Sequence, residues 1–368
     1  MASARKIASV CLFPLTVWYA VGVALRNMLF AMGVKKEQAP HVTTIGVGNL
    51  ATGGTGKTPH TEYLLRLLAD DYRTAFLSRG YRRKSKGFLL CEGTPDAETL
   101  GDEPAMVARK FPNVTTAVCE KRLVGIQRLL QSPNPPQLIV MDDVYQHRYV
   151  KPSVNILLTE YRHPYCNDHI LPFGDLREFR SAHRRANIIV VTKCPAKLNP
   201  IEKNNILLGL KPLNCQRVFF SYLDYGKPVP LFGSAPIEEK PANVLLLTGI
   251  AHPDPLVDHV ARQSRVTLCR YPDHHDFSAD DIKEIVRKFD EIPGTSKVIL
   301  TTEKDAERLR QPQLQELLHH LPVGCIPVEV RFHTSRDYDF DTIIRASVKE
   351  NTTFLHRLQT SALTQGLK

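Results

Sequence analysis

The chain carries a phosphate-loop pattern between residues 42 and 58. The sequence is Val42-Thr-Thr-Ile-Gly-Val47, followed by Gly48-Asn-Leu-Ala-Thr-Gly-Gly-Thr-Gly-Lys-Thr58. The first stretch is typical of a buried β-strand, and the second is a glycine-rich loop. Apolar residues then recur with helical spacing at positions 63, 64, 67 and 68. A strand, a loop and a helix in this order are what a nucleotide-binding phosphate loop requires.

The residue types in this loop suit the binding of nucleotide phosphates and Mg²⁺. Successive backbone N–H groups and the helix N-terminus point at the phosphates of a bound nucleotide. Lys57 is expected to reach the β- and γ-phosphate oxygens, and the Thr58 hydroxyl to ligate Mg²⁺. Ala51 stands where the strict motif has glycine, but the Gly-Lys-Thr end is intact. The pattern therefore predicts ATP and Mg²⁺ as cofactors. The predicted nucleotide-binding residues are Ala51, Thr52, Gly53, Gly54, Thr55, Gly56, Lys57 and Thr58.

A second apolar run supplies the candidate metal ligands. Gln137-Leu-Ile-Val-Met141 ends in the pair Asp142-Asp143. A carboxylate at the tip of a neighbouring strand can hold Mg²⁺, or its water shell, opposite the loop threonine. We therefore predict Thr58, Asp142 and Asp143 as metal ligands. The pattern leaves open which of the two aspartates binds the ion directly.

Strand-like apolar runs alternate with helical stretches along most of the chain. This alternation predicts an α/β fold with a largely parallel sheet of the P-loop type, flanked by helices. A second, smaller α/β lobe is indicated by apolar runs at 243–248 and 297–301, with a capping box at Ser278 and Asp281 between them. The strands predicted for the first lobe are residues 42–47, 73–78, 114–118, 137–142, 154–159 and 187–192.

The predicted boundaries divide the chain into five segments. They are an apolar helix at 1–36, a kinase core at 37–213, a linking hairpin or hinge at 214–240, a second lobe at 241–346 and a polar tail at 347–368. The hairpin is expected because short strands and turns follow one another in that segment. The tail carries no recognisable chemistry.

The amino-terminal segment has no charged residue from position 7 to 25. Its length is near the threshold for a membrane-spanning helix. Pro14 interrupts the run, and Thr16, Trp18 and Tyr19 suit the headgroup interface, so crossing the bilayer and lying in the interface both stay open. A cleaved signal peptide is the weaker interpretation, because the run leads almost directly into the nucleotide-binding strand. A buried core helix is a further alternative. We predict a membrane-associated helix.

Composition narrows the class of partner. The chain has 43% hydrophobic residues, a net charge of +10, and eight scattered cysteines without a C-x-x-C pair. Neither a zinc site nor a disulfide framework is indicated. A basic chain favours anionic partners such as nucleic acid, a nucleotide or an anionic lipid surface. Its basic clusters lack the interleaved aromatic residues of a base-stacking platform, so no nucleic acid is expected. No obligate protein partner is evident.

Several further motifs accompany the phosphate loop. They are Leu77-Ser-Arg-Gly-Tyr81, Gly101-Asp-Glu-Pro104, Asp142-Asp-Val-Tyr-Gln-His147, Leu171-Pro-Phe-Gly-Asp-Leu-Arg-Glu178, Gly249-Ile-Ala251, Asp273-His274 and Thr302-Glu-Lys-Asp305. In this combination the chain resembles the tetraacyldisaccharide 4′-kinases of lipid A biosynthesis. The resemblance extends from the apolar N-terminus to about Leu309, and it is specific because many separate motifs agree.

The resemblance implies an ATP-dependent lipid kinase. Such an enzyme transfers the γ-phosphate of ATP to the 4′-hydroxyl of tetraacyldisaccharide 1-phosphate to form lipid IVA, at the cytoplasmic face of the bacterial inner membrane. The implied partners are the acylated disaccharide phosphate lipid and the membrane surface. The family's pattern makes Asp102 the base that receives the hydroxyl proton and His274 the residue that orients it, with Lys57 in the same catalytic set. A carboxylate base suits phosphoryl transfer, which needs mostly positioning and charge neutralisation.

Four more residues are candidates for substrate contact. Gln146 and His147 follow the paired aspartates closely enough to line the same cleft. The guanidinium of Arg122 offers a fork to a phosphate group. Glu178 is a weaker candidate that is expected near the metal.

The chain also departs from the family's pattern at Arg82, Val144, Tyr145 and Asp175. These positions remove no predicted catalytic group, but they leave the shape of the substrate pocket open. Two other functions stay open as well. A membrane-associated nucleotide switch without kinase activity would tolerate loss of Asp102. A soluble kinase for a small metabolite would tolerate loss of the apolar N-terminal segment.

Overall fold

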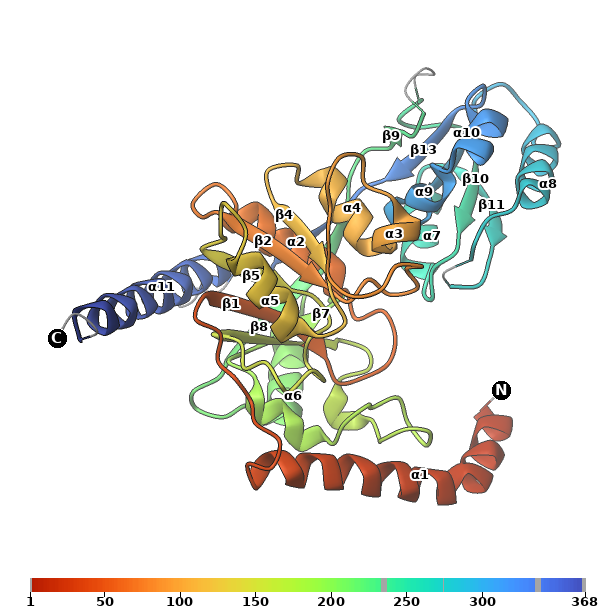
Figure 1. The fold of residues 1–368 in the computed structure, drawn as a ribbon. Helices are drawn as coiled ribbons and strands as arrows, with labels where there is room; N and C mark the ends of the chain where they lie inside the picture. Colours follow the sequence, from red (N-terminus) through yellow and green to blue (C-terminus); the bar gives the residue numbers. More distant parts are fainter. Residues whose placement is uncertain (1, 233–236, 274, 335–338, 366–368) are drawn as a thin grey trace.

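Two β-sheets organise the computed structural model, which describes residues 2–232, 237–273, 275–334 and 339–365. The larger sheet has nine strands in the order β14-β8-β7-β6-β1-β5-β2-β4-β3, and the smaller has five in the order β11-β10-β12-β13-β9 (Figure 1). The larger sheet is parallel from β8 to β4 and antiparallel only in its two outermost pairs. The predicted α/β fold, with a large and mostly parallel sheet and a smaller second sheet, is confirmed.

All six strands predicted for the first lobe form, and their ends lie within two residues of the predicted ones. Their side chains are buried on both faces, which explains the continuous Val, Ile and Leu runs. These strands are β1 (Thr43–Asn49), β2 (Thr74–Ser78), β4 (Thr115–Val118), β5 (Leu138–Met141), β6 (Val154–Glu160) and β7 (Ile188–Thr192). The sheet is completed by β3 (Leu89–Leu90), β8 (Arg217–Tyr225) and β14 (Val328–Phe332).

Helices cover both faces of this sheet. On one face, Leu64 and Leu68 of α2 (Lys57–Leu68) pack with Phe76 and Val140 in the largest hydrophobic cluster. On the other face, Ile126 of α5 (Arg122–Leu130) packs against alternate residues of the same strands. Alternate side chains of a strand point to opposite faces, so each strand contributes to both clusters. The remaining helices of this lobe include α3 (Ala97–Leu100), α4 (Asp102–Lys110) and α6 (Pro200–Leu210).

The second lobe surrounds the smaller sheet. Its strands β10 (Asn243–Thr248), β11 (Arg265–Arg270), β12 (Lys297–Thr302) and β13 (Val323–Ile326) are parallel, and β9 (Val229–Pro230) joins β13 antiparallel. Its helices are α7 (Asp254–Ala261), α8 (Ala279–Asp290), α9 (Glu303–Leu309) and α10 (Pro312–Leu318). The predicted capping box is confirmed: the Ser278 hydroxyl accepts the Asp281 N–H at 3.2 Å, and the Asp281 carboxylate accepts the Ser278 N–H at 2.8 Å.

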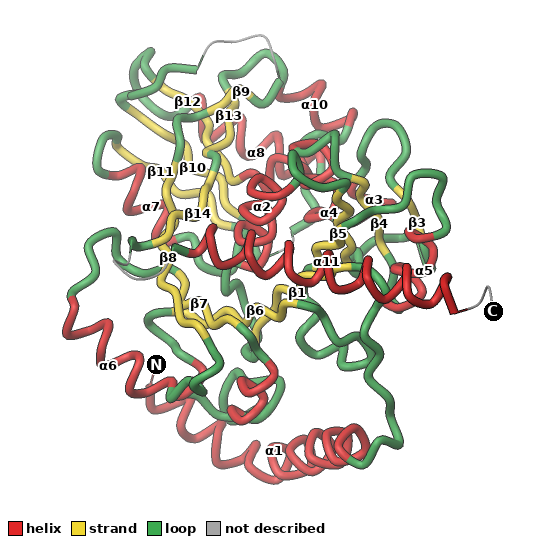
Figure 2. Tube along the Cα trace, turned by 90° about the vertical axis from the view of Figure 1, so that its left-hand side faces the viewer, coloured by secondary structure: helices red, strands yellow, loops and turns green. Residues whose placement is uncertain are grey.

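The chain returns to the large sheet after the second lobe, which differs from the predicted boundaries. β14 pairs antiparallel with β8, and α11 (Phe340–Gln365) buries Ile344 and Val348 in the core of the large sheet. The helix takes up most of the predicted polar tail (347–368) and crosses the sheet in Figure 2. The segment predicted as a linking hairpin (214–240) gives β8 to one sheet and β9 to the other. The second lobe is therefore inserted between two paired strands of the first.

The amino-terminal helix α1 (Ala2–Ala31) lies at the end of the molecule opposite the second sheet (Figures 1 and 2). Polar contacts tie it to the first lobe, among them a hydrogen bond from Arg148 Nη1 to Asn27 Oδ1 at 3.1 Å. The Tyr19 hydroxyl donates to the Arg177 carbonyl at 3.0 Å, and Arg26 forms an ion pair with Glu178 at 3.0 Å. Within the part of the chain that the structure describes, no helix is both long and apolar enough to cross a bilayer.

Candidate active site

The phosphate loop follows β1 at the carboxyl edge of the large sheet and leads into α2. Gly53 and Gly56 have φ angles of 101° and 87°, a conformation that other residues adopt only with strain. Gly56 is also the N-cap of α2. A Cβ atom on Gly53 or Gly54 would meet no other atom within 4 Å, so the outer side of the loop is open to a ligand. The predicted loop and helix are confirmed as structural elements.

Neighbouring segments hold this loop by its backbone. The Thr52 N–H donates to the Asp175 carbonyl at 2.7 Å, and the Thr192 hydroxyl donates to the Thr55 carbonyl at 2.9 Å. His60 Nδ1 lies 2.7 Å from the Gly56 carbonyl oxygen. Hydrogen bonds with Thr192 of β7, His60 of α2 and Asp175 therefore hold the loop in place.

His60 is a functional candidate that the sequence analysis missed. Its Nε2 atom lies 2.9 Å from the Ser221 hydroxyl on β8, and the ring is buried. Burial lowers the pKa of His60 to about 4, against a weaker opposing effect of the Gly56 carbonyl. The neutral ring thus donates a hydrogen bond from Nδ1 to the Gly56 carbonyl, and its Nε2 accepts a hydrogen bond from the Ser221 hydroxyl. The available sequence signal was a histidine four residues after the loop's last glycine, on the first turn of α2.

Lys57 and the paired aspartates meet at the tip of β5. The Lys57 ammonium lies 3.6 Å from Asp143 Oδ1, and Arg177 Nη1 lies 3.4 Å from Asp143 Oδ2. Burial alone would raise the pKa of Asp143, but the charges of Lys57 and Arg177 lower it below its usual value. The structure therefore brings together the predicted phosphate lysine and one of the predicted metal ligands.

Asp142 differs from its neighbour in environment. It is buried, and its Oδ1 atom accepts the Asp143 N–H at 3.0 Å and the Thr61 hydroxyl at 3.4 Å. Burial, and then the negative charge of Asp143, raise the pKa of Asp142 to about 7. Glu103 contributes to this rise, and Lys57 and Arg122 oppose it. A cation near the pair would offset this repulsion, which is what a metal-binding pair of carboxylates requires.

Unpaired buried polar atoms mark the space around the loop. Among the described residues, neither polar atom of the fully buried Asn49 side chain has a hydrogen-bond partner, and the buried Thr55 hydroxyl has none. Buried polar atoms in proteins are normally paired, so these three atoms indicate a place for a polar ligand or water. Asn49 lies in the Gly-Asn-Leu motif but was not assigned a role from sequence. These features fit a nucleotide with its metal ion.

Asp102 begins α4, and its carboxylate faces the second lobe. Arg308 of α9 donates to Asp102 Oδ2 from Nε at 2.9 Å and from Nη2 at 2.7 Å. The sequence analysis did not identify Arg308, since nothing in the local pattern links positions 206 residues apart. His274, the predicted partner of Asp102, lies outside the described residues, so that pairing stays a prediction.

Two of the candidate substrate residues are placed differently from expectation. The buried guanidinium of Arg122 donates to the Cys119 carbonyl at 2.7 Å and to the Asp142 carbonyl at 3.0 Å. It therefore supports the end of β5 from within the core and does not face an open phosphate site. Glu178 is fully buried and pairs with Arg185 at 2.8 Å and with Arg26 at 3.0 Å. Its carboxylate anchors α1 to the first lobe.

The other two candidates, Gln146 and His147, lie on the segment that follows β5. The Gln146 amide donates to the Asn49 carbonyl at 2.7 Å, and its Oε1 atom accepts from Arg177 at 3.4 Å. His147 is partly buried, and burial, reinforced by nearby arginines, lowers its pKa to about 4. The Gln146 amide is thus linked to Asp143 through Arg177, which donates to both side chains.

Val144 and Tyr145, two of the departures from the family's pattern, belong to the core. A Cβ atom on Gly46 would lie 2.7 Å from Val144 Cγ1, and one on Gly48 would lie 2.6 Å from Tyr145 Cβ. Both side chains are buried against the β1 backbone. They therefore fill the space above two glycines of β1.

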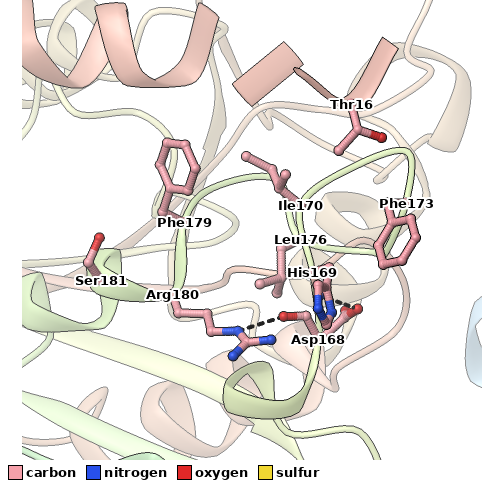
Figure 3. A pocket seen from close by; sticks show the side chains of 9 residues that line it. All are labelled: Thr16, Asp168, His169, Ile170, Phe173, Leu176, Phe179, Arg180 and Ser181. Carbon is pink, nitrogen blue, oxygen red and sulfur yellow. Dashed lines mark hydrogen bonds between the residues drawn. The ribbon is translucent and has the colours of Figure 1, made fainter. Parts of the chain in front are cut away.

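A cavity of about 550 Å³ lies between α1 and residues 168–181 (Figure 3). Its walls are mainly apolar, and Arg180 Nε donates to the Asp168 carbonyl at one side. The apolar residues that line it include Ile170, Phe173, Leu176 and Phe179. Leu176 forms a β-bridge with Ala51. The cavity is thus in direct contact with the start of the phosphate loop.

Comparison with known proteins agrees with this geometry. The profile of the LpxK family, tetraacyldisaccharide-1-P 4′-kinase, matches residues 8–349. A tetraacyldisaccharide 4′-kinase of Phocaeicola vulgatus is 40% identical over 349 residues, covering 93% of this chain and 95% of that protein. The one from Flavobacterium johnsoniae is 43% identical over 351 residues, covering 94% and 98%. The crystal structure of "apo" form LpxK from Aquifex aeolicus in complex with ATP has a TM-score of 0.69 and 27% identity, covering 93% of this chain and 99% of that one. The chain belongs to the tetraacyldisaccharide 4′-kinase family.

Proposed function

We propose that this enzyme transfers the γ-phosphoryl group of ATP to the 4′-hydroxyl of tetraacyldisaccharide 1-phosphate, forming lipid IVA. The observation that carries the proposal is the convergence of the phosphate loop, Lys57 and the paired aspartates at one edge of the large sheet. The charge of Glu103 acts on Asp142, so the start of α4 and its Asp102 lie near the same edge. Family membership supplies the acceptor.

The chain's own groups would hold ATP and Mg²⁺. Backbone N–H groups of the loop and the N-terminus of α2 would bind the phosphates, and Lys57 would leave Asp143 for the γ-phosphate. Thr58, Asp142 and Asp143 would bind the ion. The described residues offer no cluster of three or more acidic, His or Cys side chains for a metal, so phosphate oxygens and water would complete the coordination. When bound, Mg²⁺ supplies neutralisation of the phosphoryl charge.

Asp102 would act as the base. The 4′-oxygen forms a bond to the γ-phosphorus while the bond from that phosphorus to the bridging oxygen of ADP breaks. The hydroxyl proton passes to the Asp102 carboxylate, and His274 would orient that carboxylate. Phosphoryl transfer depends mainly on such positioning and charge stabilisation.

The lipid would reach the site along α1. Several large apolar side chains of this helix are exposed, among them Leu15, Val17, Trp18, Val21, Leu25 and Met28. Exposed apolar side chains in this number indicate contact with a lipid or protein surface. We place α1 in the interface of the inner membrane's cytoplasmic face, with acyl chains of the substrate along α1 and in the cavity beside it. The Tyr19 and Arg26 contacts then hold this lipid-facing helix next to the catalytic edge.

The test is transfer of labelled γ-phosphate from ATP to the tetraacyl disaccharide 1-phosphate in detergent micelles. We expect transfer by the wild type and loss of it in Lys57→Ala and Asp102→Ala. Lys84→Ala is the matched control, because Lys84 is exposed and pairs only at the surface with Glu98. Absence of transfer by a folded, ATP-binding wild type would overturn the lipid assignment. Retained transfer in Asp102→Ala would remove Asp102 from the mechanism.

A further inference from the structure

Arg308 connects the two lobes through a buried network of hydrogen bonds. Its side chain is 2% exposed, although its partners come from three separate parts of the chain. Nε and Nη2 donate to Asp102 Oδ2 at 2.9 and 2.7 Å, and Nη1 donates to Asp305 Oδ1 at 2.8 Å. Nη1 also lies 3.4 Å from the Gly249 carbonyl oxygen. The guanidinium therefore bridges a carboxylate of each lobe.

Asp305 fixes the orientation of this guanidinium from within the second lobe. Its carboxylate is fully buried and also accepts the Gly249 N–H at 2.9 Å and the Thr302 hydroxyl at 2.7 Å. A Cβ atom at position 249 would lie 2.9 Å from Asp305 Oδ1, so the close approach requires glycine. This explains physically why the Gly249 and Thr302–Asp305 motifs occur together in the chain. Together the two motifs hold the Arg308 guanidinium in a fixed position that faces the first lobe.

The geometry at Asp102 constrains the predicted base. Both donors from Arg308 meet the same oxygen, Oδ2, so the rotation of the carboxylate is set by the second lobe. Charge-assisted bonds of this kind are roughly twice as strong as neutral ones. A base for phosphoryl transfer must lie within hydrogen-bond reach of the acceptor hydroxyl, and a displacement of about 1 Å costs about 10²-fold in rate.

We propose that Arg308 is a positioning residue for the phosphoryl transfer, which holds the Asp102 carboxylate in the orientation that receives the acceptor proton. The proposal rests on the proposed role of Asp102. It makes the second lobe part of the catalytic apparatus, because Arg308, its anchor Asp305 and the supporting Gly249 all belong to that lobe. In this role Arg308 acts through Asp102.

Other ion pairs cross the same junction between α4 and α9 and provide matched controls. They are Glu103 with Lys304 at 2.9 Å, Arg109 with Glu307 at 2.8 Å and Lys110 with Glu303 at 2.6 Å. The charged groups that share the two helices with Asp102 and Arg308 include Glu103, Lys304, Asp305 and Glu307. Arg109→Gln breaks one of these pairs without touching Asp102. It therefore measures what a loss of lobe contact does by itself.

The experiment compares three variants with the wild type in the micelle assay. Arg308→Gln combined with Asp305→Asn removes the guanidinium and its fully buried anchor together, so that the Asp305 carboxylate is not left without Arg308 in the core. Arg308→Lys keeps the charge but loses the two-donor fork. Arg109→Gln is the control. For each folded variant, kcat, KM for ATP and the pH dependence of kcat/KM are measured.

We expect the double variant to lose about 10²-fold in kcat with an unchanged KM for ATP. In the pH profile of the double variant, the fall of kcat/KM on the acidic side should occur at higher pH than in the wild type. A carboxylate that loses a neighbouring cation becomes easier to protonate. Arg308→Lys should have a kcat between those of the wild type and the double variant, and the acidic fall of its kcat/KM should occur at the wild-type pH. Arg109→Gln should behave as the wild type.

Three results would overturn the proposal. They are a wild-type kcat and pH profile in the folded double variant, an equal loss in Arg109→Gln, or a shifted acidic fall of kcat/KM in Arg308→Lys. Asp102→Asn in the same assay separates this inference from the proposed function. If Asp102→Asn still transfers phosphate, the base assignment fails and the inference fails with it. If it is inactive while the Arg308 variants are normal, only the inference fails.

Discussion

The Lys57 ammonium lies 3.6 Å from the Asp143 carboxylate, so the lysine that should bind phosphate rests against a candidate metal ligand. Asp143 is also the more accessible aspartate, with 39% of its side chain exposed, whereas Asp142 is buried and accepts hydrogen bonds from Thr61 and from the backbone. Nucleotide and metal would therefore compete with an existing ion pair. The arrangement keeps the site's charges compensated until ATP arrives.

We predict from this difference that Asp143 binds Mg²⁺ directly. Asp143→Asn should raise the Mg²⁺ concentration for half-maximal transfer at least about tenfold, the loss that removal of outer-shell partners alone can cause. Asp142→Asn should change that requirement less. The measurement is a Mg²⁺ titration of the transfer rate at saturating ATP. A larger effect of Asp142→Asn would exchange the two roles.

His60 should make the fold sensitive to acid. Its folded pKa is about 4 against an ordinary value of 6.5, so between these values the unfolded chain binds a proton that the folded chain does not. Stability is therefore lost as the pH falls through this range. Relative to His60→Gln, the wild type should lose about 2 kcal/mol of unfolding free energy between pH 7 and pH 5.

Urea unfolding of both proteins at the two pH values checks this prediction. Other buried groups with shifted pKa values, such as Asp142 and His147, titrate in both proteins and cancel from the comparison. If the difference in unfolding free energy between the wild type and His60→Gln is the same at both pH values, protonation of His60 does not destabilise the fold. His60→Gln should also bind ATP more weakly, because the Gly56 carbonyl of the phosphate loop loses the hydrogen bond from the imidazole Nδ1.

The Glu178 carboxylate should contribute substantially to stability, because it is buried between two arginines. Glu178→Gln should lower the unfolding free energy by about 2 to 3 kcal/mol, near the low end for buried pairs, since Arg26 and Arg185 keep some contact with water. Glu239→Gln, in the exposed pair with Lys227, should cost less than about 1 kcal/mol. Denaturant unfolding measures both. Equal losses would mean that burial of Glu178 adds nothing.

The sequence predicted those parts of the site that a local pattern defines. The run from Val42 to Thr58 determines a strand, a loop and a helix by itself, because apolar burial and glycine conformations are local properties. The strands of the parallel sheet were predictable for the same reason. Arg122 and Glu178 were expected to face substrate or metal, and the structure buries both. Their partners are backbone carbonyls for Arg122, and Arg26 and Arg185 for Glu178, which the apolar periodicity of the sequence does not reveal.

Long-range contacts account for the other differences. Arg308 meets Asp102 only because the second lobe is inserted between β8 and β14, and the return of the chain in β14 and α11 was not anticipated. Val328-Glu-Val-Arg-Phe332 does alternate apolar and charged residues, which is the pattern of an edge strand. The polar composition of α11 gave no sign of this packing, because its buried core residues are the few apolar ones Phe340, Ile344 and Val348.

The single tryptophan of the chain, Trp18, provides a direct test of the membrane proposal. It lies on α1 and is 76% exposed, so its fluorescence in buffer should be that of an indole in water. Vesicles containing anionic phospholipid should shift the emission to shorter wavelength, because Trp side chains settle in the headgroup interface. Val21→Glu, on the same helix, should weaken the shift, and Lys84→Ala should leave it unchanged. An emission maximum that stays constant, together with failure of the protein to sediment with the vesicles, would rule out α1 as the membrane contact.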